Sequence, residues 1–589
     1  MEPDNMIPAE QIPAELWMSI FELMDAPGDL SSVVRSCRRF HNYGVRALHR
    51  NVVWRSPEQF TNNAPIWAAN PGIALSVSSL ELGISTLPSD VTAWFVDEVG
   101  HVSLYEIPEP PLPHPDEEIV DWPDMIADED AVEILQGHAT SALMKSIDYY
   151  KMHHSYATVG LYQAVMNRVM SFTNIKNLSL RHLIFTDQLF GVLYQLPQLS
   201  KLHVEFCLFP SRQSITERDP FTLPITDLSL LNLRRQVLRG GDHIHEGHHP
   251  FADMDDDVDH VLSLALAHNL RTLRVDSTAD VFANVYRKRL GGVYVYTIPG
   301  QLQHLYVQRK QAVEGVVQPV YNTEQLYPGA VYSIMERCPT LTTISLAYPL
   351  PKHSTFPKPD ALPNLTRCEG VLEAVMALTT GRPLEAISIL RSDTPTEGIL
   401  EMLARKANEH PGLQMLSLHC KTWDLEILDA ICQLFPELRK LKITFDLREP
   451  GKMWEHRDYW SGVQPFEMFD ALEEARTHPE FIHGSKGPDE DTVVSFGPHF
   501  LYRLEHLHTA HIYALPINQK PDHPPYVFDH TFGSVEEELR NLVIPWNRFC
   551  KNLRDVQLHV GYAMRRDYDG GVWRIQTIKD IRDGSDFNF

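Results

Sequence analysis

Residues 196–207 read LPQLSKLHVEFC, and the spacing of their apolar residues decides the fold of the chain. Leu199, Leu202 and Val204 form the pattern apolar-x-x-apolar-x-apolar. Residues two apart on a short strand point to the same side, so Leu202 and Val204 face one core, and Leu199 comes from the turn before the strand. Each buried aliphatic side chain contributes roughly 1.5 to 3 kcal/mol. One strand cannot bury its apolar row alone, so the pattern predicts neighbours that stack on it in a parallel sheet.

The same spacing returns along the chain at irregular intervals. Single matches arise by chance in apolar sequence, but so many in succession indicate a repeat. The further copies are Val77-Leu80-Leu82, Ile175-Leu178-Leu180, Ile225-Leu228-Leu230, Leu270-Leu273-Val275, Leu302-Leu305-Val307, Leu341-Ile344-Leu346, Leu384-Ile387-Ile389, Leu413-Leu416-Leu418, Leu438-Leu441-Ile443 and Leu553-Val556-Leu558, with a weaker copy at Leu504, Leu507 and Ile512.

Segments between these strands have helical periodicity, most clearly at 187–199, 396–409 and 424–435. Prolines such as Pro197 and Pro411 follow the helical segments and stand just before the next strand. Proline ends a helix and pushes the preceding residue to an extended conformation. This order of helix, proline and strand resembles leucine-rich repeats, although the asparagine of that consensus is mostly missing. It predicts an irregular α/β solenoid with parallel strands on the concave face and helices outside.

The stretch 12–54 reads IPAELWMSIFELMDAPGDLSSVVRSCRRFHNYGVRALHRNVVW and predicts three short helices. Proline is tolerated in a first turn, so the first helix starts at Ile12-Pro13; Asp29 is a candidate N-cap of the second. The first helix is apolar around more than half of its circumference, with one stripe at Leu16, Ile20, Leu23 and Met24 and another at Trp17 and Phe21. The third apolar set is Phe40, Tyr43, Val45, Leu48 and Val52 to Trp54. So small a unit cannot bury this surface by itself, and the excess predicts a partner.

This segment resembles an F-box. Ile12-Pro13 stands where that family usually has Leu-Pro, and the matched positions continue as Glu15-Leu16-Trp17, Ile20-Phe21-Glu22-Leu23, Asp29-Leu30 and Cys37-Arg38-Arg39-Phe40. The ending Leu48 to Trp54 is similar to the version common in fungal F-box proteins. The resemblance implies binding to a Skp-type adaptor and, through it, to a cullin and a RING protein. The residues implied to bind the adaptor are Ile12, Pro13, Leu16, Ile20, Leu23, Leu30 and Val33.

Two domains are therefore expected, an F-box at 8–56 and a leucine-rich-repeat-like solenoid at 70–589. The alternative is that the N-terminal helices only cap the repeats. The C-terminal stretches 500–507 and 546–558 resemble the last repeats of many fungal F-box proteins, and the tail 562–573 is expected to cap the stack, with Trp573 folded back over the open apolar edge.

Composition limits the classes of function. The chain has 589 residues and a net charge of −25, which repels phosphate backbones and argues against nucleic-acid binding. It contains no apolar run long enough for a membrane span, and its acidic N-terminus is not a signal peptide. Seven scattered cysteines without CxxC pairs suit reduced thiols in a cytoplasmic or nuclear protein.

Three insertions interrupt the solenoid. Residues 108–130 are proline-rich and acidic, either a solvated loop or an acidic motif for a basic partner. Residues 240–257 hold four histidines among aspartates; their spacing matches no known metal-binding helix or ribbon, so we expect no functional metal site. Residues 450–497 carry aromatic side chains that either pack as a compact loop or form a surface for a substrate.

No familiar enzyme motif is present, and no cofactor is expected. The sequence thus predicts a substrate receptor of a ubiquitin ligase whose solenoid binds a protein target, through residues between the core positions such as Ser179, His203 and Ser417. Two alternatives are a leucine-rich scaffold without a link to ubiquitin and, much less favoured, a metal-dependent enzyme that uses His245, His248 and His249.

Overall fold

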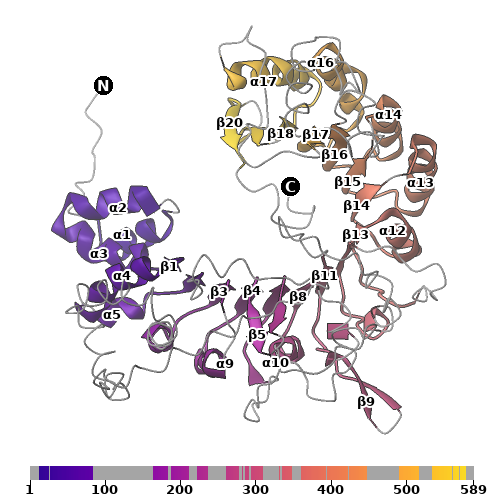
Figure 1. Ribbon diagram of the computed structural model, residues 1–589. Helices are drawn as coiled ribbons and strands as arrows, with labels where there is room; N and C mark the ends of the chain where they lie inside the picture. Colours follow the sequence, from indigo (N-terminus) through magenta and orange to yellow (C-terminus); the bar gives the residue numbers. More distant parts are fainter. Residues whose placement is uncertain are drawn as a thin grey trace, which may run out of the picture. The chain divides into compact units, whose positions relative to one another are not determined.

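The computed structural model describes residues 12–24, 27–69, 71–83, 164–183, 187–210, 222–236, 260–276, 281–282, 285–290, 293–308, 331, 334–347, 360–392, 394–421, 423–447, 490–516, 534–559, 561–568 and 571–578. The chain divides into two compact units (Figure 1). Unit 1 comprises Met1–Gln303 and Arg309–Ile334, and unit 2 comprises His304–Gln308 and Met335–Phe589. The predicted insertions at 108–130 and 240–257 lie outside the described residues.

Unit 1 begins with the three predicted helices. They are α1 (Ala14–Glu22), α2 (Pro27–Ser36) and α3 (Arg38–Leu48). Pro13 is the N-cap of α1, as its missing N–H allows. Asp29 is not the N-cap of α2, because that helix already starts at Pro27 and Asp29 lies in its first turn. A carboxylate at this position still interacts favourably with the helix dipole.

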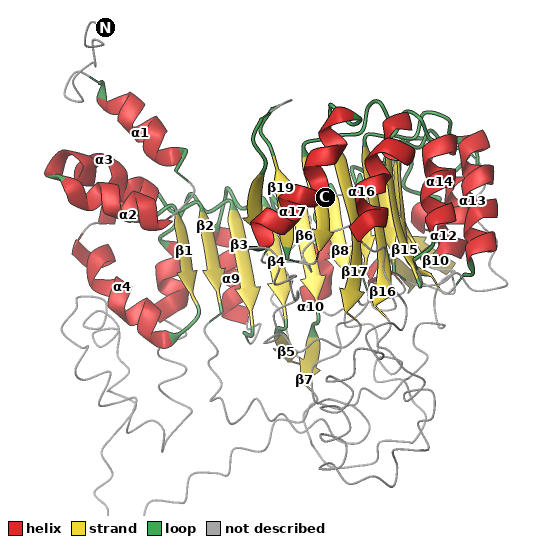
Figure 2. Cartoon of the chain, turned by 90° about the horizontal axis from the view of Figure 1, so that it is seen from above, coloured by secondary structure: helices red, strands yellow, loops and turns green. Residues whose placement is uncertain are grey.

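A parallel sheet follows the helices in unit 1. Its strands, in spatial order, are β1 (Asn51–Trp54), β2 (Ser79–Leu82), β3 (Asn177–Arg181), β4 (Lys201–Glu205), β6 (Asp227–Leu231) and β8 (Thr272–Val275) (Figure 2). The segments between strands include α4 (Pro57–Ala69), α5 (Pro71–Ala74), α9 (Asp187–Gln195), α10 (His260–Ser263), η5 (Leu264–Leu266) and the small pair β5 (Leu208–Pro210) and β7 (Arg234–Gln236). The sheet starts at Asn51, which is inside the segment 8–56 predicted as a separate domain.

The strand register confirms the repeat pattern. Leu80 pairs with Leu178, Leu178 with Leu202, Leu202 with Leu228, and Leu228 with Leu273. All five side chains are buried. Equivalent leucines therefore stack in one row, as expected when each repeat buries its apolar side chains against its neighbours.

Several strands of unit 1 end in a left-handed residue that is not glycine. His182, Phe206 and Asn232 follow β3, β4 and β6, with φ angles of 54°, 51° and 51°. Their backbone N–H groups donate to Glu205 O, Leu231 O and Asp276 Oδ2, each on the next strand or directly after it. The left-handed turn thus continues the hydrogen bonding between repeats past the end of each strand.

Unit 2 continues the same architecture. Its strands, in order, are β11 (His304–Val307), β12 (Thr343–Leu346), β13 (Arg367–Gly370), β14 (Ala386–Ser392), β15 (Met415–Cys420), β16 (Lys440–Leu447), β17 (Thr509–Pro516) and β18 (Asp555–His559), all parallel, then β19 (Tyr562–Arg565) and β20 (Arg574–Thr577), which are antiparallel. Its helices are α12 (Leu372–Thr379), α13 (Thr396–Glu409), α14 (Leu425–Leu434), α16 (Glu490–His499), η11 (Leu501–Arg503), α17 (Val535–Val543) and η12 (Ile544–Arg548). Figure 1 shows α12, α13 and α14 on one side of strands β13 to β16.

Two parts of unit 2 differ from the sequence pattern. Strand β13 carries Cys368 and Gly370 at its core positions, so it has no aliphatic pair to identify it. A Cβ atom at Gly370 would lie 2.9 Å from Leu346 O, which explains the glycine. Residues 490–497, predicted as part of an insertion, lie in α16, and this helix packs on η12 through the hydrogen bond from Trp546 Nε1 to Val493 O (3.1 Å).

Asparagine side chains link neighbouring repeats. They stand at a different position from the asparagine of the leucine-rich-repeat consensus. Three side-chain amides donate to a carbonyl of the preceding repeat: Asn174 to Leu75 (2.6 Å), Asn364 to Pro339 (2.9 Å) and Asn552 to Glu505 (2.7 Å). Each asparagine stands directly before the first apolar residue of its repeat. The amide therefore ties two consecutive turns together.

The C-terminal tail caps unit 2, as predicted. Strands β19 and β20 turn back antiparallel on β18, and Trp573 is buried with 3% exposure. Its Nε1 donates to Asn547 Oδ1 (3.0 Å), and Arg566 donates to the carbonyls of Leu553 and Lys551. This ending covers the apolar edge that a terminal repeat leaves open.

Candidate partner-binding face of the N-terminal helices

The three N-terminal helices share a small aromatic core. Phe21 of α1 packs with Leu30 and Val34 of α2, and all three are nearly inaccessible to solvent. Trp17 and Phe40 complete the cluster: the Trp17 and Phe40 ring centroids are 4.6 Å apart, and Phe21 meets Phe40 edge to face at 5.6 Å. Tilted and edge-on contacts of this kind add to the free energy of burial. One of the two predicted stripes of α1 is therefore used inside the unit.

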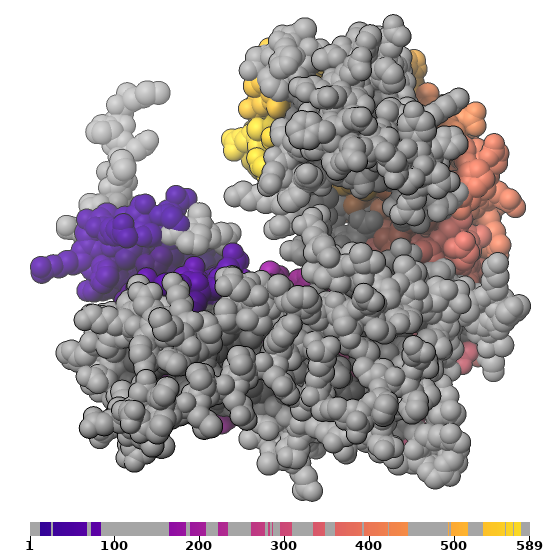
Figure 3. Space-filling view, in the orientation of Figure 1, coloured from indigo at the N-terminus to yellow at the C-terminus, as the bar shows by residue number. Residues whose placement is uncertain are grey.

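Three of the four residues of the other stripe face solvent, whereas Met24 is partly buried and packs against the core. Leu16, Ile20 and Leu23 are 55%, 42% and 80% exposed. They lie three or four residues apart, so they share one side of the helix. The N-terminal helices contribute to the surface seen in the space-filling view, where they are indigo (Figure 3). Exposed aliphatic residues that follow one helix face are typical of a surface that binds another protein.

The structure separates the residues implied by the family resemblance. Pro13 is exposed and Ile12 is half-buried at the start of the solvent-facing stripe. Leu30, however, is only 4% exposed and belongs to the core, and Val33 packs partly against the same core. The side chain of Leu30 thus packs between α1 and α2 in this structure, and its contact with an adaptor stays a prediction.

Close packing fixes the angle between the helices. A Cβ atom at Gly44 of α3 would lie 2.5 Å from Val34 Cγ2 and 3.3 Å from a ring carbon of Phe21. Glycine is thus required where α3 crosses the other two helices. Arg39 of α3 adds a hydrogen bond from Nη2 to Ile12 O (3.2 Å), which holds the residue that leads into α1. Because these contacts fix α1 relative to α2 and α3, they also fix the orientation of the exposed residues Leu16, Ile20 and Leu23.

The charge of this unit differs from that of the rest of the chain. Between Arg35 and Arg50 the sequence has five arginines and no acidic residue. Arg35, Arg38 and Arg46 are exposed. An apolar helix face beside a basic helix favours a partner with an apolar groove and acidic surroundings.

The strand face between the core positions offers a second surface. Ser179 and His203 are half-buried in unit 1, whereas Ser417 in unit 2 is only 1% exposed and is not accessible to a partner. His203 Nε2 and Arg181 Nη2 both contact Glu205 Oε2 at 3.2 Å. The hydrogen bond from His203 and the charge of Arg181 lower the pKa of Glu205.

Buried polar residues also occupy this face in unit 2. Ser345 bonds the carboxylate of Glu369, and His511 Nε2 lies 3.1 Å from Asp555 Oδ1. Burial lowers the pKa of His511 although the carboxylate is near. His511 is 3% exposed, so its ring does not reach solvent, whereas the Asp555 side chain is 19% exposed. The pair links neighbouring strands β17 and β18.

The described residues contain no group of three or more histidine, cysteine or acidic side chains that could hold a metal ion. The histidines proposed for a metal-dependent enzyme lie outside them. Burial raises the pKa to about 12 for the six buried cysteines, Cys207, Cys338, Cys368, Cys420, Cys432 and Cys550. Thiols of this kind are core side chains and poor nucleophiles.

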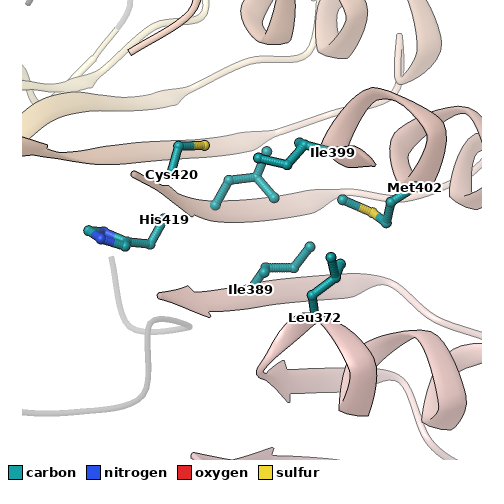
Figure 4. A pocket seen from close by; sticks show the side chains of 7 residues that line it. Leu372, Ile389, Ile399, Met402, His419 and Cys420 are labelled. Carbon is teal, nitrogen blue, oxygen red and sulfur yellow. The ribbon is translucent and has the colours of Figure 1, made fainter. Parts of the chain in front are cut away.

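A small cavity lies between α12, α13 and strands β14 and β15 (Figure 4). Its lining is largely aliphatic and sulfur-containing, from Leu372, Ile389, Ile399, Met402, Leu418, His419 and Cys420. The ring of His419 is engaged with Thr444 Oγ1 at 2.8 Å. The cavity has a volume of about 10 Å³, enough for about one water molecule, so it cannot hold a substrate.

No helix in the described part of the chain combines the length and the apolar character that a membrane crossing needs.

No family model and no curated protein matches the chain. Among solved structures, it is similar to an internalin from Listeria monocytogenes, at 13% identity over 59% of this chain and 77% of that chain, with a TM-score of 0.24. An LRR protein from Leptospira interrogans gives 12% identity over 66% and 74% of the two chains, with a TM-score of 0.24. The Toll chain of the Drosophila Toll–Spatzle complex gives 12% identity over 51% and 40%, also with a TM-score of 0.24. The fold class therefore stands on the repeated parallel strands themselves.

Proposed function

We propose that this chain is a substrate receptor of a ubiquitin ligase. In this proposal α1, α2 and α3 bind a Skp-type adaptor, and the strands of unit 1 and unit 2 hold a protein target. The chain itself performs no chemistry. It brings a target close to a conjugating enzyme, and proximity alone raises the rate of transfer to the lysines of the target.

The observation that carries this proposal is the division of α1 into two apolar stripes. Trp17 and Phe21 build the core of the helical unit, while Leu16, Ile20 and Leu23 remain in solvent. Burying three aliphatic side chains in a partner contributes several kcal/mol, at roughly 25 cal/mol per Å² of apolar surface. The sequence resemblance to an F-box starts at the same helix and supplies the identity of the partner.

The direct test is co-expression of the full chain with a Skp-type adaptor, followed by size-exclusion chromatography. Wild-type chain should co-elute with the adaptor in a stoichiometric complex. Leu16→Asp with Leu23→Asp should abolish co-elution and leave the melting curve unchanged, because both side chains are exposed. Leu425→Asp, a change at a partly exposed leucine of α14, is the matched control and should co-elute normally. Co-elution of the Leu16 and Leu23 variant would contradict the proposal.

A scaffold without a link to ubiquitin is the second candidate. It is favoured by the short connection between α3, which ends at Leu48, and β1, which starts at Asn51 and pairs with β2. Helices attached so closely to the first strand can serve as an N-terminal cap. If the wild-type chain fails to co-elute with the adaptor, this second function takes precedence.

A further inference from the structure

The residues directly before β16, β17 and β18 form a column across three neighbouring repeats of unit 2 (Figure 1). They are Arg439, His508 and Arg554. The His508 N–H donates to Arg439 O (2.9 Å), and the Arg554 N–H donates to His508 O (2.8 Å). Equivalent positions on neighbouring parallel strands lie about 4.8 Å apart, and their side chains point to the same side. We call these three residues the basic column.

The same position in unit 1 has a different composition. Its backbone hydrogen bonds run in the same way from repeat to repeat, but the cations there are isolated. Lys176 stands between Ser78 and Ser200, and Arg271 stands between Thr226 and Gln303. The basic column thus brings together residue types that unit 1 keeps apart at the equivalent position.

The first residues of the same strands add one further cation beside the column. Lys440 pairs with Thr509, Thr509 with Asp555, and Asp555 with Arg565. The carboxylate of Asp555 is balanced within the fold, because it accepts a hydrogen bond from Arg565 Nε (2.8 Å) and lies 3.1 Å from His511 Nε2. Lys440 therefore contributes a positive charge that this row does not cancel.

The electrostatics of His508 show that the cations lie close together. Burial lowers the pKa of His508. The charges of Lys440, Arg439 and Arg554 lower this pKa further, and Asp555 opposes them. The ring is therefore neutral near pH 7. Arg439 and Arg554 are exposed, and Lys440 and His508 are half-buried, so the positive charge of the column is gathered at the surface.

This cluster of cations contrasts with a chain whose net charge is −25. A cationic cluster in an acidic protein attracts an acidic ligand to one place. Glu437 and Glu505 are exposed in the loops that lead to Arg439 and His508, so acidic side chains border the column. Such a border favours a short acidic ligand over a nucleic acid, whose dense row of phosphates would extend past the column and be repelled.

The spacing of the basic column favours a helical ligand. Its residues follow one another at steps of about 4.8 Å. Side chains three or four residues apart on an α-helix have Cβ atoms about 5 to 6 Å apart. On an extended strand, side chains of the same face are two residues, or about 6.6 Å, apart. Carboxylates that follow one face of a helix therefore match the column better than those of an extended segment.

We propose that the basic column of Arg439, His508 and Arg554 binds an acidic helical segment of a partner protein. Carboxylates on successive turns of that helix pair with Arg439 and Arg554, and the ring of His508 donates a hydrogen bond to a carboxylate between them. Lys440 strengthens the attraction from beside the column. This inference goes beyond adaptor binding, because a scaffold without a link to ubiquitin would use the same column.

The test uses the full chain and a fluorescein-labelled, alanine-based peptide with glutamates four residues apart. Binding is followed by fluorescence anisotropy in about 0.1 M salt, where charges more than about 10 Å away are largely screened. Arg439→Glu with Arg554→Glu should weaken binding about tenfold or more, because two attractive pairs become repulsive. The matched control is Lys176→Glu with Arg271→Glu, which makes the same change of charge at equivalent exposed positions of unit 1. It should weaken binding less than about twofold.

A charge swap guards against misfolding. The Arg439 and Arg554 variant should gain affinity for the same peptide with lysine in place of glutamate, which a misfolded column would not do. No measurable binding by the wild-type chain, or an equal loss in the control variant, would overturn the proposal. So would equally tight binding of a peptide of the same composition with its glutamates two residues apart. Tighter binding of inorganic polyphosphate that depends on the same two arginines would assign the column to phosphates and would also overturn it.

Discussion

The guanidinium of Arg566 lies over the indole ring of Trp573, with Cζ 4.9 Å from the ring centroid. Both side chains are almost fully buried, and both bond Asn547 Oδ1. This stacked pair closes the last repeat of unit 2 and gives the first prediction.

Trp573→Ala should destabilise unit 2 by about 3 to 5 kcal/mol, because it opens a cavity and removes the cation–π contact. Urea unfolding followed by circular dichroism measures the loss. Val572→Ala, next in sequence but 71% exposed, should change stability by less than about 0.5 kcal/mol. Equal effects of the two changes would mean that the tail does not cap the sheet.

Gly44→Ala should destabilise the N-terminal helices by about 1 to 3 kcal/mol, since the new methyl group meets Val34. Helix propensity alone would make the alanine variant more stable than the wild type. A loss of stability would therefore mean that the clash outweighs helix propensity. Gly28→Ala is the control, because a Cβ atom there has no neighbour within 4 Å. Val34→Ala combined with Gly44→Ala should recover part of the loss, as measured by thermal unfolding followed by circular dichroism.

Asn552→Asp should cost about 1 kcal/mol, because aspartate keeps the shape of the side chain but cannot donate to Glu505 O. The same change at Asn42, an exposed residue of α3, should be nearly neutral. Denaturant midpoints of the two variants give the comparison. If both behave alike, the amide contributes nothing to the contact between repeats.

The free energy of unfolding should decrease as the pH is lowered. Burial lowers the pKa of His559 from 6.5 to about 4, so the folded state holds this ring neutral. Between these two values the unfolded chain binds the proton more readily, and stability therefore decreases as the pH falls from about 6.5 to about 4. Burial also lowers the pKa of His511 and His410, with the same sign. His559→Gln should reduce the slope of the denaturant midpoint against pH, and an unchanged slope would contradict this account.

Of the seven cysteines, Cys37 alone is exposed. One thiol per native chain should therefore react quickly with a disulfide reagent, and Cys37→Ser should remove that reaction. The other six should react only after unfolding, since burial raises their pKa to about 12. Two or more fast thiols would show that a repeat opens in the native state.

The periodic part of the fold is predictable from sequence because each strand repeats one simple physical requirement. The spacing of apolar residues marks Leu178, Leu202 and Leu228 as equivalent core positions, and these leucines do pair in register. The pattern does not predict strand β13, because Cys368 and Gly370 occupy the positions of the aliphatic pair. The hairpin of β9 (Arg287–Leu290) and β10 (Val293–Tyr296) was also missed, although Gly291-Gly292 between alternating residues is a hairpin signal.

The candidate site was only partly predictable. Helical spacing separated the stripe of Leu16, Ile20, Leu23 and Met24 from that of Trp17 and Phe21. The structure exposes the first stripe except for Met24, and it buries or partly buries the second. Spacing could not place Leu30, because its burial depends on how α2 packs against α1. Nor could it identify Gly44, whose importance arises only where helices cross.

The register between neighbouring strands does not depend on the length of the connection between them. Ser79 pairs with Asn177 as directly as Asn177 pairs with Lys201, although the first connection is several times longer. The entropy of closing a loop grows only with the logarithm of its length, so lengthening a connection costs little. A lineage of such proteins can therefore acquire or lose whole segments between repeats while the strands keep their partners, and new surfaces can evolve without a new fold.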